Sequence, residues 1–345
     1  MTFPGLISAT CGPTRSFPCS PEPPRYRVPV KWDQDATPDM SNVDDQRSSG
    51  GAGGGFQFPL PGGGGRGGGM GLPIGKGSGI LGIVIALAAI FILPRLTGGG
   101  DLPFNVEQMD LPGAVPEASG PTGRADDAPT DETGRFIVWV FNDVQRTWTK
   151  QFAEGQQKYS NAKLNLFRNS VNTGCGQASS AVGPFYCPAD SEVYIDETFF
   201  DELADRFGAP GDFAQAYVVA HEMGHHVQNV LGISDDAQRL SRKNPDQANA
   251  LSIRLELQAD CLAGVWARNV YLDDSANRGL EQGDIEEGLG AASAVGDDRI
   301  QEQATGRIDP ETWNHGSSEQ RVKWFKVGFD NGQAEQCDTF GVDRP

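Results

Sequence analysis

Two segments of this 345-residue chain have the apolar spacing of long helices, and each carries two metal-ligand residue types four positions apart. The first segment, residues 211–231, contains the sequence HEMGH, in which His221 and His225 form one such pair. That spacing puts both imidazoles on one helical face, about one turn apart, so both can reach one metal ion. The motif follows the apolar run Ala216–Ala220, which predicts a half-buried helix. The fold must therefore supply partners for these polar side chains.

Glu222 lies between the two histidines in the sequence, where its carboxylate could take a proton from a metal-bound water molecule. The chain has only four histidines, so the chance of an accidental HExxH is on the order of a few in a thousand. An exposed polar helix face is the alternative, and it fits a half-buried segment poorly. His226 points about 100° away from the motif face, so we interpret it as structural.

A catalytic zinc ion takes three protein ligands and keeps one position open, so two histidines require a third partner. The second helical segment, residues 248–270, supplies the pair Glu256 and Asp260. Glu256 could complete the metal site, while Asp260 accepts the free ring N–H of a ligand histidine. Apolar neighbours bury this helix and disfavour the alternative of a surface salt-bridge face. No third histidine follows six residues after His225, so the pattern HExxHxxGxxH is absent.

The periodicity after residue 134 alternates between short strands and longer helices. Three strands are predicted, at 136–141, 163–167 and 192–196. Helices are predicted at 142–152, 199–207, 211–231, 248–270, 285–294 and 318–329. A few strands followed by several helices indicate an α+β domain, which we place at residues 134–345.

The first 130 residues have no core-forming pattern, so we expect one folded domain and not two. Residues 1–78 are predicted to be a disordered Pro/Gly-rich segment, because 15 glycines within residues 51–80 bury too little to offset their ordering entropy. Residues 98–133 have the composition of a linker. The net charge of −18 argues against a nucleic-acid partner, since phosphate binding needs a basic face.

Residues 79–97 include an uncharged apolar run of fifteen residues, GILGIVIALAAIFIL, with an apolar extension beyond Arg95. We predict a single transmembrane anchor here, although a span usually needs about 20 residues. A buried core helix and a cleaved signal peptide are the alternatives. The glycine-rich flanks offer nothing to bury a helix against, and the run begins too late for a signal peptide.

Basic residues precede this apolar run and acidic residues dominate after it, which favours a cytoplasmic N-terminus and an extracytoplasmic catalytic domain at the cell membrane. Four of the six cysteines fall in the candidate domain, and four cysteines allow three pairings among which sequence alone cannot choose. Proximity favours a bridge between Cys175 and Cys187, which leaves Cys261 with Cys337. Disulfides suit an oxidising compartment, whereas reduced cysteines would suit a cytosolic protein.

HExxH followed by an ExxAD helix resembles the pattern of the gluzincin metallopeptidases. The segments GPFYCPAD, FGAPGDFAQAYVVAHEMGHHVQN and ELQADCLAGVWA resemble the putative neutral zinc metallopeptidases of bacteria over about residues 135–340. The resemblance implies a zincin-like fold, one Zn²⁺ per chain and a protein or peptide substrate. It implies that His221, His225 and Glu256 bind the zinc and that Glu222 is the catalytic general base.

Two further roles follow from this resemblance. A strand upstream of the motif helix pairs with the substrate backbone in gluzincins, and the matching positions here are Ala181, Val182, Gly183 and Phe185. His315, in the sequence HGSSEQR, corresponds to the late residue that stabilises the oxyanion. The alternative for His315 is to cap the helix that begins near Ser318.

The sequence thus predicts a membrane-anchored metallopeptidase that hydrolyses peptide bonds with zinc-activated water and a glutamate base. One alternative is a catalytically silent zinc-binding module tethered to the membrane, and another is a structural envelope protein whose glycine-rich tether matters most. The intact Glu222 disfavours the first alternative. The second leaves both helical motifs unexplained.

Overall fold

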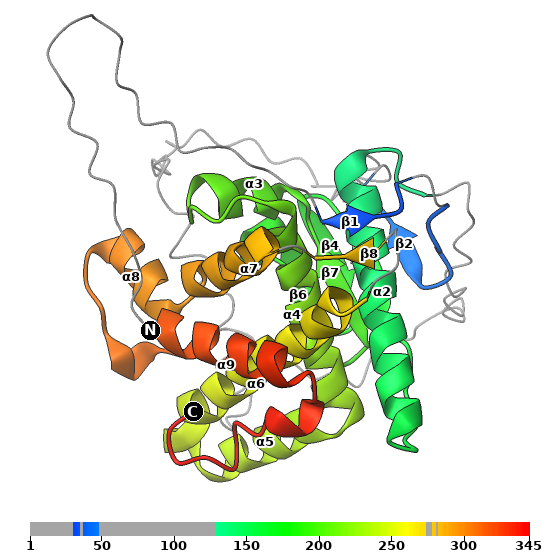
Figure 1. Ribbon diagram of the computed structural model, residues 1–345. Helices are drawn as coiled ribbons and strands as arrows, with labels where there is room; N and C mark the ends of the chain where they lie inside the picture. Colours follow the sequence, from blue (N-terminus) through cyan, green and yellow to red (C-terminus); the bar gives the residue numbers. More distant parts are fainter. Residues whose placement is uncertain (1–29, 35–36, 48–127, 274–277, 281) are drawn as a thin grey trace, which may run out of the picture.

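The computed structural model describes residues 30–34, 37–47, 128–273, 278–280 and 282–345, which fold as helices packed on a small sheet (Figure 1). This arrangement confirms the predicted α+β class. The predicted anchor at residues 79–97, and the linker up to residue 127, lie outside the described residues. Within the described ranges, no helix combines the length and the apolar character needed to cross a membrane.

A four-stranded sheet forms one layer, with the strand order β2-β3-β7-β6. The first three strands run parallel, and β6 pairs antiparallel with β7 at the end of the sheet. On one face of the sheet the side chains are mostly apolar and pack on the helices. The opposite face is polar over β2 and β3, and at β6 it carries a smaller apolar cluster that includes Phe185, Cys187 and Tyr194. The strands are β2 (Val43–Asp45), β3 (Lys163–Leu166), β6 (Phe185–Cys187) and β7 (Glu192–Ile195).

The prediction of a strand at residues 136–141 is wrong, because these residues belong to the N-terminal half of helix α2 (Glu132–Glu154). The helix begins where the Asp131 side chain accepts the backbone N–H of Gly134 at 2.7 Å. A short, continuous apolar run is compatible with either a strand or a helix buried on several sides. Here α2 packs against the helix that carries HEMGH and against β3, so almost every residue of the run is buried.

The expectation that the first 130 residues lie outside the folded domain is wrong for residues 30–34 and 37–47. Their strand β1 (Lys31–Trp32) pairs with β8 (Arg278–Gly279), and β2 forms one edge of the main sheet. Three of their apolar side chains, Val30, Met40 and Val43, are buried in the core. The short strands gave no periodic signal, because two or three residues are too few to show alternation.

The remaining predicted strands and helices are confirmed, with small differences at their ends. The longest of these helices, α4 (Asp212–Val230) and α6 (Ala248–Tyr271), carry HEMGH and ELQAD and pack against each other. In Figure 1, α9 (Ser318–Asn331) lies along α6. A Cβ atom at Gly328 of α9 would lie 1.8 Å from the Cys261 carbonyl oxygen, so this close packing requires glycine. The other helices are α3 (Thr198–Asp205), α5 (Ile233–Lys243), α7 (Gln282–Ala294) and α8 (Asp297–Thr305).

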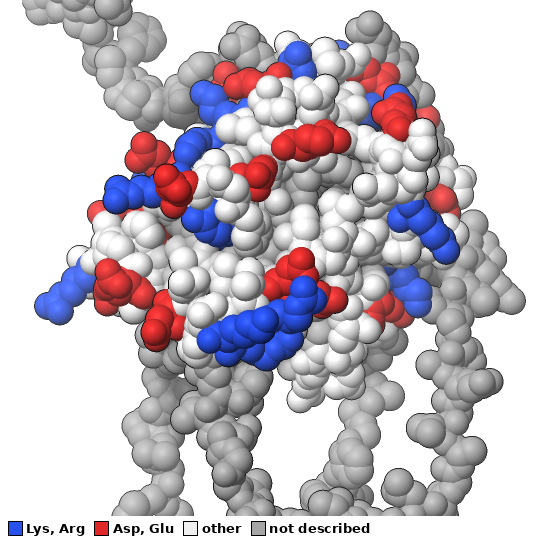
Figure 2. Space-filling view, turned by 90° about the horizontal axis from the view of Figure 1, so that it is seen from below, with Lys and Arg blue, Asp and Glu red and all other residues white. Residues whose placement is uncertain are grey.

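Two disulfides confirm the predicted pairing. Cys175 is bonded to Cys187, which ties the hairpin of β4 (Ser170–Thr173) and β5 (Gly176–Ser179) to the end of β6. Cys261 of α6 is bonded to Cys337 in the C-terminal segment. Acidic and basic side chains are interspersed on the face drawn in Figure 2, around a broad uncharged area. On that face the net negative charge is therefore not gathered into one acidic surface.

Candidate metal centre

The three predicted metal ligands, His221, His225 and Glu256, meet between α4 and α6. The Nε2 atom of His221 lies 3.2 Å from one carboxylate oxygen of Glu256, and the Nε2 atom of His225 lies 3.5 Å from the other. One donor atom from each of the three side chains falls within 4.8 Å of the other two. The two imidazole rings stand edge to face, with an interplanar angle of 89°. Both Nε2 atoms therefore face the same carboxylate.

The close approach of the two helices depends on Gly224, inside the HEMGH motif. A Cβ atom at this position would lie 3.0 Å from both the Cα atom and the carbonyl oxygen of Ala259. Ala259 itself precedes Asp260 on α6, so two small residues face each other beside the site. The small pair lets α4 approach α6 closely enough for the histidines to reach Glu256.

Hydrogen bonds at the opposite ring atoms place the imidazole protons. The Nδ1 atom of His221 donates to Asp260 Oδ1 at 2.8 Å, as the sequence predicted. The Nδ1 atom of His225 lies 2.9 Å from Gln228 Oε1. Since the Gln228 amide nitrogen donates to the Leu255 carbonyl and to Gln258, its oxygen must accept from His225. Both histidines thus carry a proton on Nδ1 and point Nε2 toward Glu256. Burial lowers the pKa of His221, but Asp260 and Glu256 outweigh it and raise that pKa to about 10, so a second proton stays on its Nε2 until a metal ion replaces it.

This donor set fits a divalent metal ion. Two neutral imidazole nitrogens and a carboxylate are ligands that zinc accepts in catalytic sites. The Nε2 atoms and the carboxylate oxygens would repel each other unless a cation, either a proton or a metal ion, lay between them. Burial raises the pKa of Glu256, but the neighbouring His225, His221 and His315 outweigh it and hold that pKa below its usual value.

A buried cluster behind His221 fixes Asp260. This carboxylate is fully buried and accepts hydrogen bonds from Tyr217 Oη at 2.5 Å and from Arg321 at 2.8 and 2.9 Å, besides His221. Burial raises the pKa of Asp260, and the stronger opposing effect of Arg321 and His221 holds it below its usual range. The ionised carboxylate can therefore only accept, which keeps His221 in the orientation that the metal site needs.

Three residues that support the site, Arg321, Tyr217 and Gln228, were not predicted from the sequence. Tyr217 precedes His221 by four residues, so helical spacing could have placed it on the same face. Gln228 follows His225 by three residues and gives a similar, weaker signal. Arg321 lies on α9, 61 residues after Asp260, and only the packing of α9 on α6 brings the two together.

Glu222 lies beside the ligand cluster and is 8% exposed. Burial raises its pKa to about 7, with a further increase from Glu256. His221, Arg321 and a hydrogen bond from the Tyr186 backbone amide act in the opposite direction. Tyr186 belongs to the edge strand β6, so this strand runs past the carboxylate that the sequence predicted to be the base.

His315 lies close enough to Glu256 for the charge of each side chain to shift the pKa of the other. Its Nδ1 atom is 3.0 Å from Asp297 Oδ1, while Asp297 Oδ2 accepts the backbone N–H groups of residues 314–316. Burial lowers the pKa of His315, and the bonded Asp297 together with Glu256 raises it above its usual value. The N-cap of α9 is Ser317, which forms a capping box with Gln320, so His315 is not the cap.

The structure changes the boundaries of the predicted substrate-binding strand. Ala181 and Val182 lie in a short 3-10 helix, Ser180–Val182, and Gly183 follows it with a φ of +79°. Pro184 has no N–H to contribute to a ladder, so the strand begins only at Phe185. The prediction of a strand is therefore wrong for Ala181–Gly183 and correct for Phe185. The edge of β6 that faces away from β7 pairs with no other described strand.

His226 has the structural role that its direction predicted. Its Nε2 atom lies 2.7 Å from the Ser160 carbonyl oxygen, which can only accept, and its Nδ1 atom lies 3.1 Å from the Tyr186 hydroxyl. Asn229 donates to the same hydroxyl at 2.9 Å. The contacts with Tyr186 attach α4 to the edge strand β6.

The similarity of this chain to known proteins agrees with a metal-binding site of this kind. Residues 30–340 match the family described as putative neutral zinc metallopeptidase. The uncharacterized protein YpfJ of Escherichia coli K12 is 42% identical over 309 residues, which cover 88% of this chain and 96% of YpfJ. The uncharacterized protein Rv2575 of Mycobacterium tuberculosis is 48% identical over 213 residues, 60% of this chain and 70% of Rv2575. No solved structure matches significantly. The chain belongs to the putative neutral zinc metallopeptidase family.

Proposed function

We propose that this protein is a zinc-dependent endopeptidase with a zincin-like catalytic domain. The observation that carries the proposal is the convergence of two Nε2 atoms and the Glu256 carboxylate beside the buried Glu222. Zinc held by His221, His225 and Glu256 would supply Lewis-acid chemistry, acidifying water and polarising a peptide carbonyl. A protein or peptide is the proposed substrate, since the family is one of peptidases.

Glu222 is the proposed general base. It takes the proton from the attacking water at its carboxylate and later gives that proton to the leaving amine. Burial raises the pKa of Glu222, which makes its carboxylate a better proton acceptor than an exposed one. The backbone amide of Tyr186 holds the carboxylate while it exchanges the proton.

His315 and β6 are the proposed contacts for the reacting peptide. With Nδ1 bonded to Asp297, His315 can donate from Nε2 to the oxyanion that develops on the scissile carbonyl. The free edge of β6 would bind the substrate backbone as an added strand next to Glu222. Phe185 is the one predicted substrate-binding residue that lies in this strand.

We also propose that residues 79–97 anchor the protein in the cell membrane, with the N-terminus cytoplasmic and the catalytic domain extracytoplasmic. The apolar run and the charges around it support this orientation. The two disulfides support an oxidising compartment.

The function is tested with the full-length protein in mild detergent, because residues 30–47 belong to the fold and a shorter fragment would lose them. Wild type should bind one zinc ion per chain and cleave an unfolded protein, and a chelator should stop cleavage. Glu222→Gln should retain zinc and lose cleavage by several orders of magnitude. Glu154→Gln, an exposed position at the end of α2, is the matched control and should cleave normally.

If wild type binds zinc one-to-one and cleaves no protein or peptide, the peptidase proposal fails and a silent zinc-binding module replaces it. Topology is measured separately, with protease added to intact cells and thiol labelling of the cysteines. A catalytic domain that is protected in intact cells, with reduced cysteines, would contradict the extracytoplasmic orientation.

A further inference from the structure

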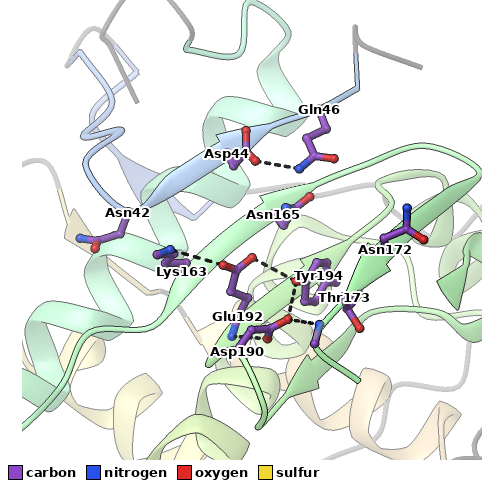
Figure 3. Close-up of a pocket in the computed structure, with 11 residues that line it drawn as sticks. Asn42, Asp44, Gln46, Lys163, Asn165, Asn172, Thr173, Asp190, Glu192 and Tyr194 are labelled. Carbon is purple, nitrogen blue, oxygen red and sulfur yellow. Dashed lines mark hydrogen bonds and ion pairs between the residues drawn. The ribbon is translucent and has the colours of Figure 1, made fainter. Parts of the chain in front are cut away.

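A polar cavity lies on the face of the main sheet that points away from α4 and the metal centre. It has a volume of about 310 Å³ and lies between the strands β2, β3 and β7 and the β4–β5 hairpin (Figure 3). A cavity of this size is at the lower end of the range that small organic ligands occupy. The proposed peptidase mechanism uses none of the side chains that line it.

The register of the sheet builds the floor of this cavity. Asp44, Asn165 and Tyr194 are direct neighbours on β2, β3 and β7, so their side chains emerge on the same face. Lys163 and Glu192 form the adjacent row. Apart from Asp45 of β2, the alternate positions on these strands are apolar and pack against the helices. The polar face is therefore continuous across three strands.

Asn165 stands out among these side chains because it is only 4% exposed and its Oδ1 atom has no hydrogen-bond partner. Figure 3 shows its amide between Asp44 and Tyr194, with no interaction drawn to either. A buried acceptor without a donor destabilises a fold by the desolvation of that group. The cost is avoidable, since an apolar residue of similar size would fit a β-strand as well.

The three neighbouring carboxylates differ from Asn165, because each already has a donor. Asp44 accepts from Gln46 Nε2 at 2.7 Å. Asp190 accepts from Tyr194 Oη at 2.8 Å and from the Gly174 backbone at 2.6 Å. Glu192 accepts from the same hydroxyl at 3.1 Å and pairs with Lys163 at 3.5 Å. These contacts hold the walls in place. The unmet demand for a donor is concentrated on Asn165, next to Asp44.

Charge indicates the class of ligand. Three carboxylates line the cavity against one ammonium group, that of Lys163, so the lining is negative overall. A bare metal ion fits this cavity poorly. In the metal centre, the donor atoms of three described residues lie within 4.8 Å of one another, and the three carboxylates of the cavity form no such set. An organic cation can span a wider set of acceptors and supplies the N–H donor that Asn165 lacks.

We propose that this cavity binds a small organic cation, an alkylammonium or guanidinium compound, whose N–H group donates to Asn165 Oδ1 beside the Asp44 carboxylate. The Cys175–Cys187 bond does not line this cavity but holds one of its walls in place. It ties the tip of the β4–β5 hairpin to the sheet, so that Asn172 and Thr173 remain over the floor of the cavity. The site is independent of the proposed peptidase activity.

Butylguanidinium and the uncharged butylurea, which has nearly the same shape, are suitable probes. Their binding to the full-length protein is measured by calorimetry at concentrations up to about 10 mM, because fragments of this size often bind weakly. Butylguanidinium should bind one-to-one to the wild-type protein, and butylurea should bind at least about tenfold more weakly. Equal binding of the two probes, or no binding of butylguanidinium, would overturn the proposal.

Variants locate the site. Asn165→Leu should weaken butylguanidinium binding by about ten- to a hundredfold and raise the melting temperature, because it removes an unpartnered buried acceptor. Asn165→Asp keeps the acceptor and adds a charge, so it should bind at least as tightly as wild type. Asp44→Asn should weaken binding by about tenfold, whereas Asp201→Asn, on the exposed side of α3, should not.

Unchanged binding by Asn165→Leu would overturn the proposed contact, whether or not other variants bind. A lowered melting temperature for Asn165→Leu, together with lost binding by Asn165→Asp, would identify Asn165 as a structural residue and likewise contradict the proposal. A response to calcium chloride in place of butylguanidinium would replace the organic cation with a metal ion. None of these outcomes depends on cleavage of a peptide.

Discussion

Neutralising Asp260 provides the most direct test of how the buried cluster supports the metal site. Asp260 is fully buried and accepts four hydrogen bonds, two of them from the Arg321 guanidinium. In Asp260→Asn, an NH₂ group replaces one of the two carboxylate oxygens and faces a donor. The guanidinium also loses its fully buried counter-charge, and the next carboxylate, Glu256, is 4.0 Å away.

Removing one partner of a buried ion pair typically costs about 3–5 kcal/mol, and we expect a loss of this size in the free energy of unfolding. The same change disturbs the orientation of His221, so zinc affinity should fall by about ten- to a hundredfold. Urea unfolding of the chelated full-length protein measures the first effect. Competition with a fluorescent chelator measures the second.

The double variant Asp260→Asn with Arg321→Met separates the ion pair from simple packing. With both charges removed, the total loss should be smaller than the sum of the single losses by about 2 kcal/mol. The reasoning is refuted if Asp260→Asn unfolds within about 1 kcal/mol of wild type or if the double variant is additive.

Acid provides an independent check on the same cluster. Because the folded-state pKa of Asp260 lies below its unfolded value of about 4, its stabilisation is present above pH 4 and is lost as pH falls through the folded-state pKa. The stability difference between wild type and Asp260→Asn should therefore shrink in strong acid. A difference that stays constant down to the lowest pH at which both fold would contradict this assignment.

Three further predictions concern other parts of the fold. Gly224→Ala should lower the free energy of unfolding by about 1–3 kcal/mol and weaken zinc binding, because its Cβ would press on Ala259 and separate α4 from α6. Zinc affinity is measured by competition with a chelator, and an unchanged affinity would show that this contact does not set the geometry of the site. His315→Gln should lower kcat by about a hundredfold with little change in KM, because the proposed contact forms with the oxyanion in the transition state. Steady-state kinetics measure both constants, and a change in KM alone would assign His315 to substrate binding. Replacing both Cys261 and Cys337 by Ala should lower the free energy of unfolding by about 4 kcal/mol, since their disulfide joins residues 76 positions apart. Urea unfolding measures this loss, and a value below about 1 kcal/mol would contradict the prediction.

Local sequence was sufficient for the features that depend on spacing within one helix. The positions of His221, His225 and Glu222 follow from a 3.6-residue repeat, and so does the pairing of Glu256 with Asp260. The disulfide between Cys175 and Cys187 was equally accessible, because the two cysteines are only 12 positions apart. Each of these predictions used geometry that a short segment carries by itself.

The prediction for residues 136–141 failed because an apolar run records burial and not backbone conformation. Whether such a run is a strand or a helix depends on what covers it, and α2 is covered by α4 and by the sheet. Residues 30–47 were missed for a related reason. Their strands are stable only through hydrogen bonds to β3 and β8, which are distant in the sequence.

The sequence by itself determined which residues can hold a metal ion, because ligand type and helical spacing are local properties. Only the tertiary structure decided how those residues are oriented and what else surrounds them. Arg321 reaches Asp260 from α9, Asp297 positions His315, and the register of three strands brings Asp44 beside Asn165. These contacts join residues far apart in the chain, and their energies depend on burial and charge that exist only when the helices and strands have packed.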